Sequence, residues 1–233
     1  MKQIVITSNM RNEIKQVERW YNWVSQIADG GILIVDTFST DGTAEFFDNK
    51  PNTVVIQSSI IVDEGYGPAR TQMRELAKKH FPGAIWSTYF DADEDISEDE
   101  FHIFRWIKDY LEADYDVVAF PRIDWYDLEK SKSENDYRFA PDWQARMTRL
   151  DCPDIKYIRR LHEQVVGYKN IYCNLTTPKI NHYHRDKSVK EKREGIGLLC
   201  AKLHMEDTEY GHTYPEHPSE AKYREQYLKE GLK

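Results

Sequence analysis

The sequence lacks the features that mark a membrane protein, a disulfide-rich protein or a non-specific nucleic-acid binder. Its 233 residues contain no apolar run that approaches the roughly 18 residues of a membrane-spanning helix. The three cysteines, Cys152, Cys173 and Cys200, have no paired spacing, which argues against a zinc site or a disulfide framework. The formal net charge is −8, whereas a protein that binds nucleic acid without sequence preference usually carries a basic surface.

The sequence also bears on the compartment in which the protein is expected. The apolar part of the first segment, MKQIVITSNMRNE, is shorter than a signal peptide requires. Cysteines without paired spacing are typical of buried or free thiols in a reducing compartment. We therefore expect a cytoplasmic protein, and one that would meet a membrane only peripherally.

The residues that are present are typical of a globular protein. Hydrophobic residues make up 40% and charged residues 31% of the chain, which is long enough to bury a sizeable core. Aromatic residues are frequent at 13%, with 15 Tyr and 6 Trp. Such side chains fill cores, but they also stack on sugars and bases.

Strand and helix patterns alternate over the first 121 residues. The expected strands are apolar and rich in β-branched residues: QIVITSN, GILIVD, NTVVIQ, AIWSTYFDAD and YDVVAFPRIDWY. The expected helices cover 13–28, a short segment after a Ser39 or Thr40 N-cap, 67–80, and 97–112 with Ser97 as its N-cap. This order predicts an α/β fold with a Rossmann-like, mostly parallel central sheet that is flanked by helices on both faces.

Three polar residues stand where strands of this predicted sheet end. Asn9, Asp36 and Asp91 each lie at the carboxyl end of an expected strand. Ligands of open parallel sheets bind at the carboxyl ends of the strands. We therefore expect these three side chains to lie near a ligand.

From about residue 122 the pattern becomes less regular. Residues 127–142, DLEKSKSENDYRFAPD, are polar and predict a long mobile loop. The strand candidates after it are WQARMTRL, IKYIRR and TPKINHYH, and helices are expected over 187–206 and 217–229. Because the sequence has no internal repeat and no low-complexity linker, we expect a single domain over 1–233 with a C-terminal helical extension.

The segment DADEDISEDE, residues 91–100, holds seven acidic residues and is open to several readings. Three of its acids fit the first ligand positions of a calcium loop, but Ile96 and His102 stand where Gly and Glu are required. A phosphatase of the haloacid-dehalogenase type would place its two aspartates at the first strand, and would want Thr or Val at the position of Asp95. Both alternatives therefore fit poorly.

The acids of this segment fall into two groups. Asp95, Glu98, Asp99 and Glu100 stand where a helix begins, and negative charge is favoured there. Asp91 and Asp93 stand at the end of the strand itself. Two carboxylates separated by one residue can hold a hard divalent ion against a diphosphate.

Four stretches in order resemble the family 2 glycosyltransferases with the GT-A fold, which transfer a sugar from a nucleotide-sugar donor. The stretches cover residues 4–95: IVITSNMRNE, ILIVDTFSTDGT, GYGPARTQMRELA and YFDADED. RRLHEQVVG and INHYHRDKS are similar to segments of a subset related to bacterial lipopolysaccharide-core transferases. The resemblance implies a nucleotide-sugar-binding half over 1–121, an acceptor and catalytic half over 122–186, and C-terminal helices over 187–233.

The resemblance also implies roles in donor binding. The residues expected to contact the nucleoside or the phosphates are Thr7, Asn9, Glu13, Asp36, Arg70, Asp91, Arg185 and Lys187. Mn²⁺ or Mg²⁺ would be held by Asp93, more directly than by Asp91, and by His182 or His184. The alternatives are a cap of the following turn for Asp36, a surface position for Arg70, and a structural role for the histidines.

For an inverting transfer, the resemblance implies Glu163 as the base that deprotonates the acceptor hydroxyl. Asp142 and Asp124 are reserves, and the alternative for Glu163 is an ion pair with Arg159 or Arg160. Stacking on the acceptor is expected of three aromatic residues, for which core packing is equally compatible: Trp125, Tyr126 and Trp143.

The substrates are defined only by class at this stage. UDP is the family's commonest nucleotide, and the acceptor could be a glycan, a lipid-linked saccharide, a protein, a small molecule or a hydroxylated nucleobase. A nucleotidyltransferase would want a Gly-rich, basic loop after the first strand, which SNMRNE lacks. The rival from another class is a non-catalytic nucleotide-sugar-binding protein.

Overall fold

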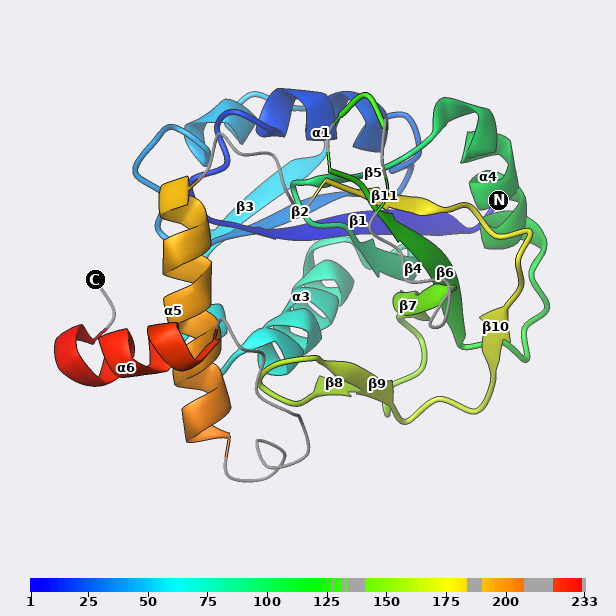
Figure 1. Ribbon diagram of the computed structural model, residues 1–233. Helices are drawn as coiled ribbons and strands as arrows, with labels where there is room; N and C mark the ends of the chain where they lie inside the picture. Colours follow the sequence, from blue (N-terminus) through cyan, green and yellow to red (C-terminus); the bar gives the residue numbers. More distant parts are fainter. Residues whose placement is uncertain (127, 131–132, 134–140, 184–189, 208–219, 232–233) are drawn as a thin grey trace.

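A computed structural model describes residues 1–126, 128–130, 133, 141–183, 190–207 and 220–231 (Figure 1). Its strands are β1 (Gln3–Met10), β2 (Gly31–Asp36), β3 (Thr53–Gln57), β4 (Ala84–Tyr89), β5 (Glu94–Ile96), β6 (Val117–Asp124), β7 (Asp142–Arg149), β8 (Lys156–Ile158), β9 (Gln164–Val166), β10 (Ile171–Cys173) and β11 (Ile180–His182). Its α-helices are α1 (Val17–Val24), α2 (Ile60–Asp63), α3 (Tyr66–His80), α4 (Phe101–Tyr110), α5 (Lys190–Glu206) and α6 (Glu220–Glu230).

One large sheet organises the molecule, in the order β3-β2-β1-β4-β7-β6-β11-β5. The first four strands in this order are parallel, because β1 pairs in parallel with both β2 and β4, and β2 with β3. β7 is antiparallel to both β4 and β6, while β10 and β11 pair in parallel with β6. The predicted mostly parallel α/β sheet is confirmed, and β8 and β9 form a separate antiparallel hairpin.

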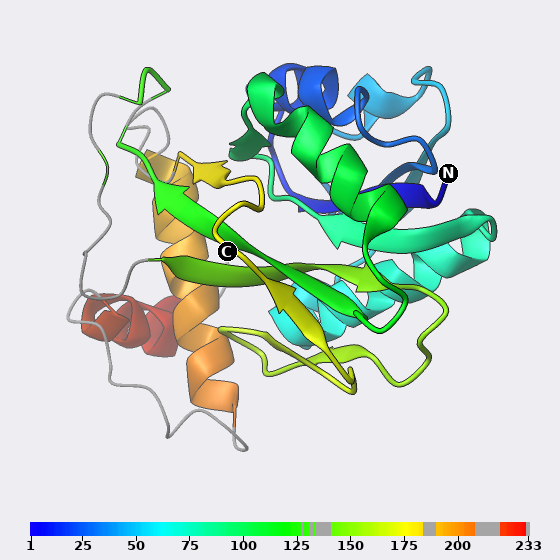
Figure 2. The same cartoon turned by 90° about the vertical axis from the view of Figure 1, so that its right-hand side faces the viewer.

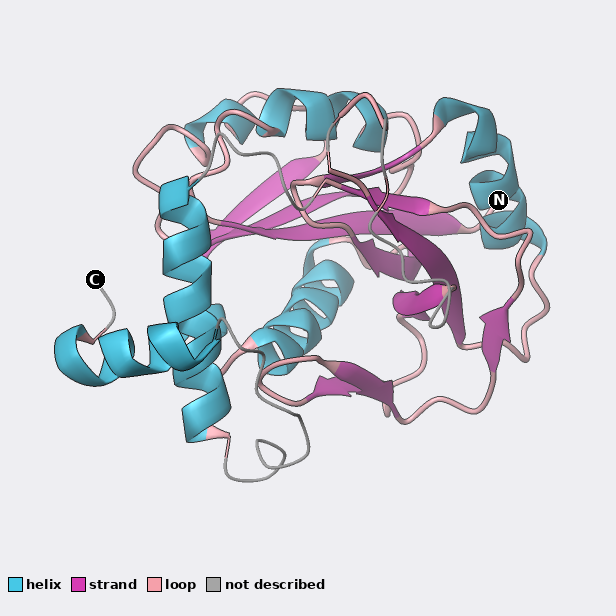
Figure 3. Ribbon diagram, in the orientation of Figure 1, coloured by secondary structure: helices cyan, strands magenta, loops and turns pink. Residues whose placement is uncertain are grey.

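Helices cover both faces of this sheet, as predicted (Figure 3). On one face, α1 and α4 pack against Ile4, Ile6 and Ile34 around the buried side chains of Trp20 and Phe104. On the other face, α3 packs against alternate residues of the same strands. Because side chains of a strand alternate between faces, one apolar run supplies both cores.

The helix expected over 13–28 is shorter than predicted and covers only Val17–Val24. The residues before it are tied to the loop after β2: the backbone N–H groups of Glu13 and Ile14 donate to Thr43 Oγ1 and Asp41 Oδ2. Ile14, which the helical pattern would bury, is 39% exposed. A local side-chain network therefore overrides the periodicity at this end.

Other local predictions were also wrong. The short helix after the second strand is a 3₁₀ turn, Glu45–Phe47, that begins after Ala44 and not after a Ser39 or Thr40 cap. Ser97 makes no side-chain cap. β5, β9 and β10 were not predicted, because each has only three residues; β5 and β10 also depend on pairing with the distant strands β11 and β6. The three cysteines are free thiols, but Cys173 is exposed.

The C-terminal helices lie together at the end of the sheet where β1 to β4 finish, a placement that Figure 1 makes visible. α5 is attached there by Lys202, whose Nζ donates to the carbonyl of Val62 at 2.6 Å. Figure 2, turned by 90°, faces the right-hand side of Figure 1, where β6, β7 and β10 lie near α4. No helix in the described ranges is both long and apolar enough to cross a membrane.

The first turn of α3 lies against the chain that leads to Glu163. The Gly67 N–H donates to the carbonyl of Arg159 at 3.0 Å, and a Cβ at Gly67 would meet that carbonyl oxygen at 2.4 Å. We expect Gly67→Ala to destabilise the fold by about 1–3 kcal/mol, because backbone atoms cannot move aside as a side chain can. Urea unfolding measures this.

Gly83→Ala is the matched control for this substitution. A Cβ at Gly83 would meet only the end of the Gln3 side chain, at 3.0 Å, and that side chain can rotate away. Equal stability of the two variants would contradict the proposed close approach of Arg159 to α3.

Candidate active site

Tyr89, the last residue of β4, lies at the centre of a cluster of charged side chains. Arg70 from α3 and Arg146 from β7 both place their guanidinium groups against the ring of Tyr89, with Cζ 4.0 and 4.3 Å from the ring centroid. Both arginine side chains are almost fully buried, at 2% and 3% exposure. Contacts of this kind stabilise cations that are removed from water.

Buried cations need carboxylate partners, and the turn after β4 supplies them. Asp91 Oδ1 lies 2.6 Å from Arg70 Nη2, and Asp91 Oδ2 lies 3.6 Å from Arg146 Nη1. Glu94, which is fully buried, pairs with Arg146 Nη2 at 2.8 Å and accepts the backbone N–H of Asp91 at 2.9 Å. The turn from Asp91 to Glu94 is thus fixed by two arginines.

This arrangement separates the pKa values of the two acids. Burial alone would raise the pKa of Asp91, but Arg70 and Arg146 hold it well below its usual value. Burial raises the pKa of Glu94, in spite of the opposing effect of Arg146. Asp91 is therefore the firmly ionised member of the pair.

Glu163, the predicted base, lies in the same cluster. Its Oε1 accepts the hydroxyl of Tyr89 at 3.2 Å and lies 3.4 Å from Arg70 Nε. The alternative ion pair does not involve Arg160, which pairs with Glu206 at 3.3 Å. Glu163 keeps 18% of its side-chain surface exposed, so it can still reach a ligand.

His182, at the end of β11, lies between two carboxylates. Its Nδ1 is 2.6 Å from Asp124 Oδ1, and its Nε2 is 3.6 Å from Asp93 Oδ2. Burial disfavours the charged imidazolium, but the hydrogen bonds to Asp124 and Asp93 raise the pKa of His182 to about 10. The Tyr183 N–H donates to the carbonyl of Asp93 at 3.0 Å, which fixes the two segments side by side.

The residues predicted to contact the nucleoside differ in their surroundings, and only one of the three that follow lies in the charged cluster. Asn9 joins the charged cluster, with Oδ1 3.5 Å from Arg70 Nη1. Thr7 is buried, and its hydroxyl donates to the carbonyl of Thr88. Asp36 is fully buried and accepts both the N–H and the hydroxyl of Ser39, which supports its capping role. Contacts of these residues with a nucleoside remain predictions.

Four further predicted residues lie at neighbouring ends of β6 and β7. Asp142 is 2.8 Å from Arg122, and Trp125 donates to Asn181 Oδ1 at 2.9 Å. Tyr126 and Trp143 are half-buried, and an acceptor contact stays a prediction for both. Glu13 contributes its backbone N–H to Thr43, as described above. His184, Arg185 and Lys187 fall outside the described residues.

Three members of the cluster were not predicted: Tyr89, Glu94 and Arg146. The sequence carries no signal for Arg146, because the alternation of Trp143, Ala145 and Met147 puts it on the polar side of the strand, whereas the fold buries Arg146, Met147 and Thr148 consecutively. The surface position considered for Arg70 is wrong, because the side chain is buried.

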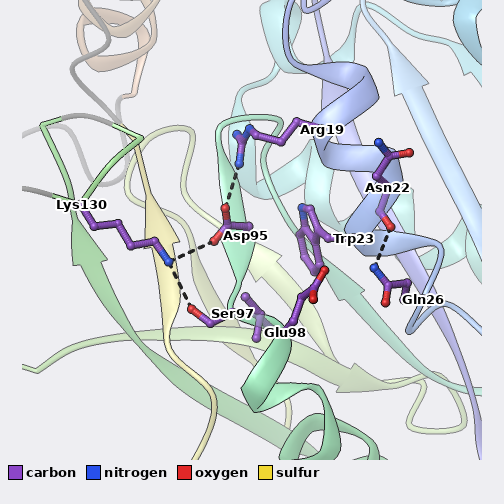
Figure 4. A pocket seen from close by; sticks show the side chains of 9 residues that line it. Arg19, Asn22, Trp23, Gln26, Asp95, Ser97, Glu98 and Lys130 are labelled. Carbon is purple, nitrogen blue, oxygen red and sulfur yellow. Dashed lines mark hydrogen bonds and ion pairs between the residues drawn. The ribbon is translucent and has the colours of Figure 1, made fainter.

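Two pockets lie away from this cluster. One of about 310 Å³ separates α1 from residues 95–98, and Lys130 closes it by contacts with Ser97 and Asp95 (Figure 4). Another of about 810 Å³ is lined by Pro68, Thr71, Gln72 and Glu75 of α3 and by residues 156–160. These α3 residues share one helix face, and Arg70 lies on the opposite face.

Arg146→Met should destabilise the protein by about 3–5 kcal/mol, because it leaves Glu94 buried without its cation. Arg149→Met serves as the control on the same strand. Arg149 pairs with the more exposed Asp151, and such pairs contribute about 1 kcal/mol or less. Urea unfolding of both variants tests the difference, and similar losses would contradict the assigned role of the buried pair.

No protein-family model matches the sequence, and a search of curated proteins gave no match. The fold, however, has solved neighbours. Mannosyl-3-phosphoglycerate synthase from Rubrobacter xylanophilus aligns with a TM-score of 0.53 and 11% identity, over 93% of this chain and 78% of that chain.

Two structures of glucosyl-3-phosphoglycerate synthase from Mycobacterium tuberculosis also align. The complex with Mn²⁺, UDP and phosphoglyceric acid has a TM-score of 0.51 and 14% identity, over 92% of this chain and 80% of that chain. The complex with Mn²⁺, UDP and glucosyl-3-phosphoglycerate has a TM-score of 0.38 and 18% identity, over 53% of this chain and only 44% of that chain. At these identities the first two alignments establish the fold alone, which is the GT-A fold of glycosyltransferases.

Proposed function

We propose that the chain is a metal-dependent glycosyltransferase that moves a sugar from a nucleoside-diphosphate sugar to an acceptor hydroxyl, with UDP as the first candidate nucleotide. The observation that carries the proposal is the placement of Asp93 Oδ2 3.6 Å from His182 Nε2, two residues after Asp91, which pairs with Arg70. A carboxylate, an imidazole and an arginine side by side are the groups that recognise a metal–diphosphate.

The described residues fit a divalent ion in part. Asp93 and His182 would hold Mn²⁺ or Mg²⁺, and His182 would release its imidazolium proton, because only a neutral imidazole binds a metal. The ion would neutralise the negative charge that develops on the leaving diphosphate. Asp124 binds the other nitrogen of His182, the arrangement that usually orients a metal-binding histidine. No group of three or more His, Cys, Asp or Glu within the described ranges is arranged around one ion. That fits an ion whose other ligands are phosphate oxygens and water.

Asp91 has a different role in this proposal. Both of its oxygens face arginines, so we expect it to hold Arg70 and Arg146 in place instead of binding the ion. Within the described part of the chain, the buried Nδ2 of Asn9 has no hydrogen-bond partner. A buried donor of this kind usually has a partner in the functional state, and an oxygen of the donor substrate would supply it.

Glu163 supports catalysis in the inverting transfer that the sequence resemblance implies. It would take the proton of the acceptor hydroxyl while that oxygen attacks the anomeric carbon. The Tyr89 hydroxyl and Arg70 fix the direction of its carboxylate. Membership of family 2 and of the lipopolysaccharide-core-like subset belongs to the same proposal, and so does the domain division into donor, acceptor and C-terminal parts.

The acceptor stays open among the classes given above. The mycobacterial neighbour was solved with phosphoglyceric acid, and the Rubrobacter neighbour is named for the same acid. Phosphoglycerate therefore belongs in the first acceptor screen, beside saccharides and simple polyols.

Asp93→Asn should remove metal-dependent nucleotide binding. We expect its affinity for the preferred nucleoside diphosphate with Mn²⁺ to fall at least about tenfold, because one of two protein ligands loses its charge. Calorimetric titration with UDP, GDP, CDP and dTDP, with and without Mn²⁺, measures this effect.

Asp99→Asn is the matched control, since Asp99 stands in the acidic 3₁₀ turn Glu98–Glu100 outside the cluster. It should bind as the wild type does. If the wild type binds none of the four diphosphates with Mn²⁺ present, the glycosyltransferase proposal fails.

Glu163→Gln should separate chemistry from binding. We expect nucleotide affinity to stay within about twofold, while hydrolysis of the preferred nucleotide-sugar falls about 100- to 10,000-fold through loss of the base. Glu75→Gln, an exposed acid of α3, controls for the change of charge. Wild-type binding without any hydrolysis or transfer would favour the non-catalytic binding protein instead.

A further inference from the structure

The loop after β2, residues 37–43, is held rigidly by side-chain hydrogen bonds. Asp36 accepts both donors of Ser39, and Asn12 Oδ1 accepts the N–H of Thr40 at 2.9 Å. Asp41 accepts the N–H groups of Ile14 and Thr43. These hydrogen bonds fix the loop from both sides.

Phe38 is the unusual residue of this loop. Its φ of 51° lies in the left-handed region, which favours Gly or Asn and is costly for a large side chain. Its backbone N–H is fixed by Gln57 Oε1 at 3.1 Å, yet its ring is 59% exposed. Among the described residues, Phe38 is the one exposed large hydrophobic residue with a positive φ.

Neither burial nor backbone preference explains a phenylalanine here. A single exposed apolar residue on a helix needs no explanation, and Trp106 of α4 is such a case. At Phe38, however, a side chain stands at a positive φ, and glycine at this position would avoid the strain of that backbone conformation. Strain of this kind is typical of positions that contact ligands.

The position of Phe38 relates it to the candidate active site. It follows Asp36, the last residue of β2, by two residues, and β1 lies between β2 and β4. Neighbouring strands are about 4.8 Å apart, so the ends of β2 and β4 are roughly 10 Å apart along one edge. A nucleoside diphosphate whose phosphates lie near Arg70 and Asp93, beyond β4, can extend along this edge toward β2.

The side chains predicted to line the nucleoside pocket leave one requirement unmet. Thr7 and Asp36 are buried and already hydrogen-bonded, and Asn9 is directed to Arg70. None of them offers an apolar surface to the face of a base, and bases gain much of their binding energy from stacking. Phe38, by contrast, is an exposed aromatic residue that directly follows the end of β2.

We infer that Phe38 is the nucleobase-stacking residue of the donor site, and that the strained turn exists to present its ring. This inference rests on the proposed function, since it assumes a nucleoside diphosphate at the strand ends. It assigns a contact to the base and none to the phosphates or the metal. Loss of the ring should therefore weaken the binding of ligands that carry a base and leave the binding of ligands without a base unchanged.

The experiment compares two ligands and two properties of the same variants. Phe38→Gly should lower the affinity for UDP, or for whichever diphosphate the wild type prefers, roughly 5- to 100-fold with Mn²⁺ present. Inorganic pyrophosphate with Mn²⁺, which has no base, should bind Phe38→Gly and wild type equally. The thermal unfolding temperature of Phe38→Gly without ligand should rise by about 2–4 °C, because glycine removes the strain that a side chain causes at positive φ.

Two further variants make the outcome decisive. Phe38→Tyr keeps a ring and should retain wild-type nucleotide affinity, whereas Phe38→Asn, which tolerates a positive φ, should lose it. Trp106→Ala removes an exposed aromatic residue elsewhere and should leave nucleotide affinity unchanged. Wild-type nucleotide affinity in Phe38→Gly, or an equal loss for pyrophosphate, would overturn the inference. Absence of nucleotide binding by the wild type would instead overturn the proposed function.

Discussion

The packing of two buried arginines against one tyrosine ring is the constraint on which the candidate site depends. Arg70 and Arg146 are nearly inaccessible to water, and a buried cation without a carboxylate is strongly unfavourable. Asp91, Glu94 and Glu163 meet this need, and in doing so they are fixed in direction. The turn after β4 consequently places Asp93 beside His182, so the charge balance of the interior also sets the geometry at the surface.

Much of the fold could be predicted from the sequence, because short apolar runs rich in β-branched residues, such as GILIVD, are typical of strands that are buried on both faces. The acidic segment was divided correctly in part: Glu98, Asp99 and Glu100 form a helical turn, while Asp91 to Glu94 belong to the charged cluster. Side-chain hydrogen bonds that the sequence pattern does not reveal made some of the other local predictions wrong. The periodicity around Ile14 predicts a helix, but hydrogen bonds to Asp41 and Thr43 keep this segment in a turn.

The cluster could be predicted only in part. The resemblance indicated Arg70, Asp91 and Glu163, but not Tyr89, Glu94 and Arg146, which come from β4, β5 and β7. Tyr89 reads in the sequence as one more apolar strand residue, and nothing nearby indicates that two cations cover its ring. Contacts between segments far apart in the chain carry no local signal.

The pairing of β11 with β5 affects the order in which the protein can become active during its synthesis. Asp93 is made early, but its partner His182 lies in a strand that joins the sheet through β6 and β5 near the end of the described core. A chain still emerging from the ribosome could form the β3-β2-β1-β4 layer, yet it would lack the histidine. Such late, non-local pairing is slow to form. Under the proposed function, a nascent chain would gain its metal-binding histidine only when β11, the last strand among the described residues, joins the sheet.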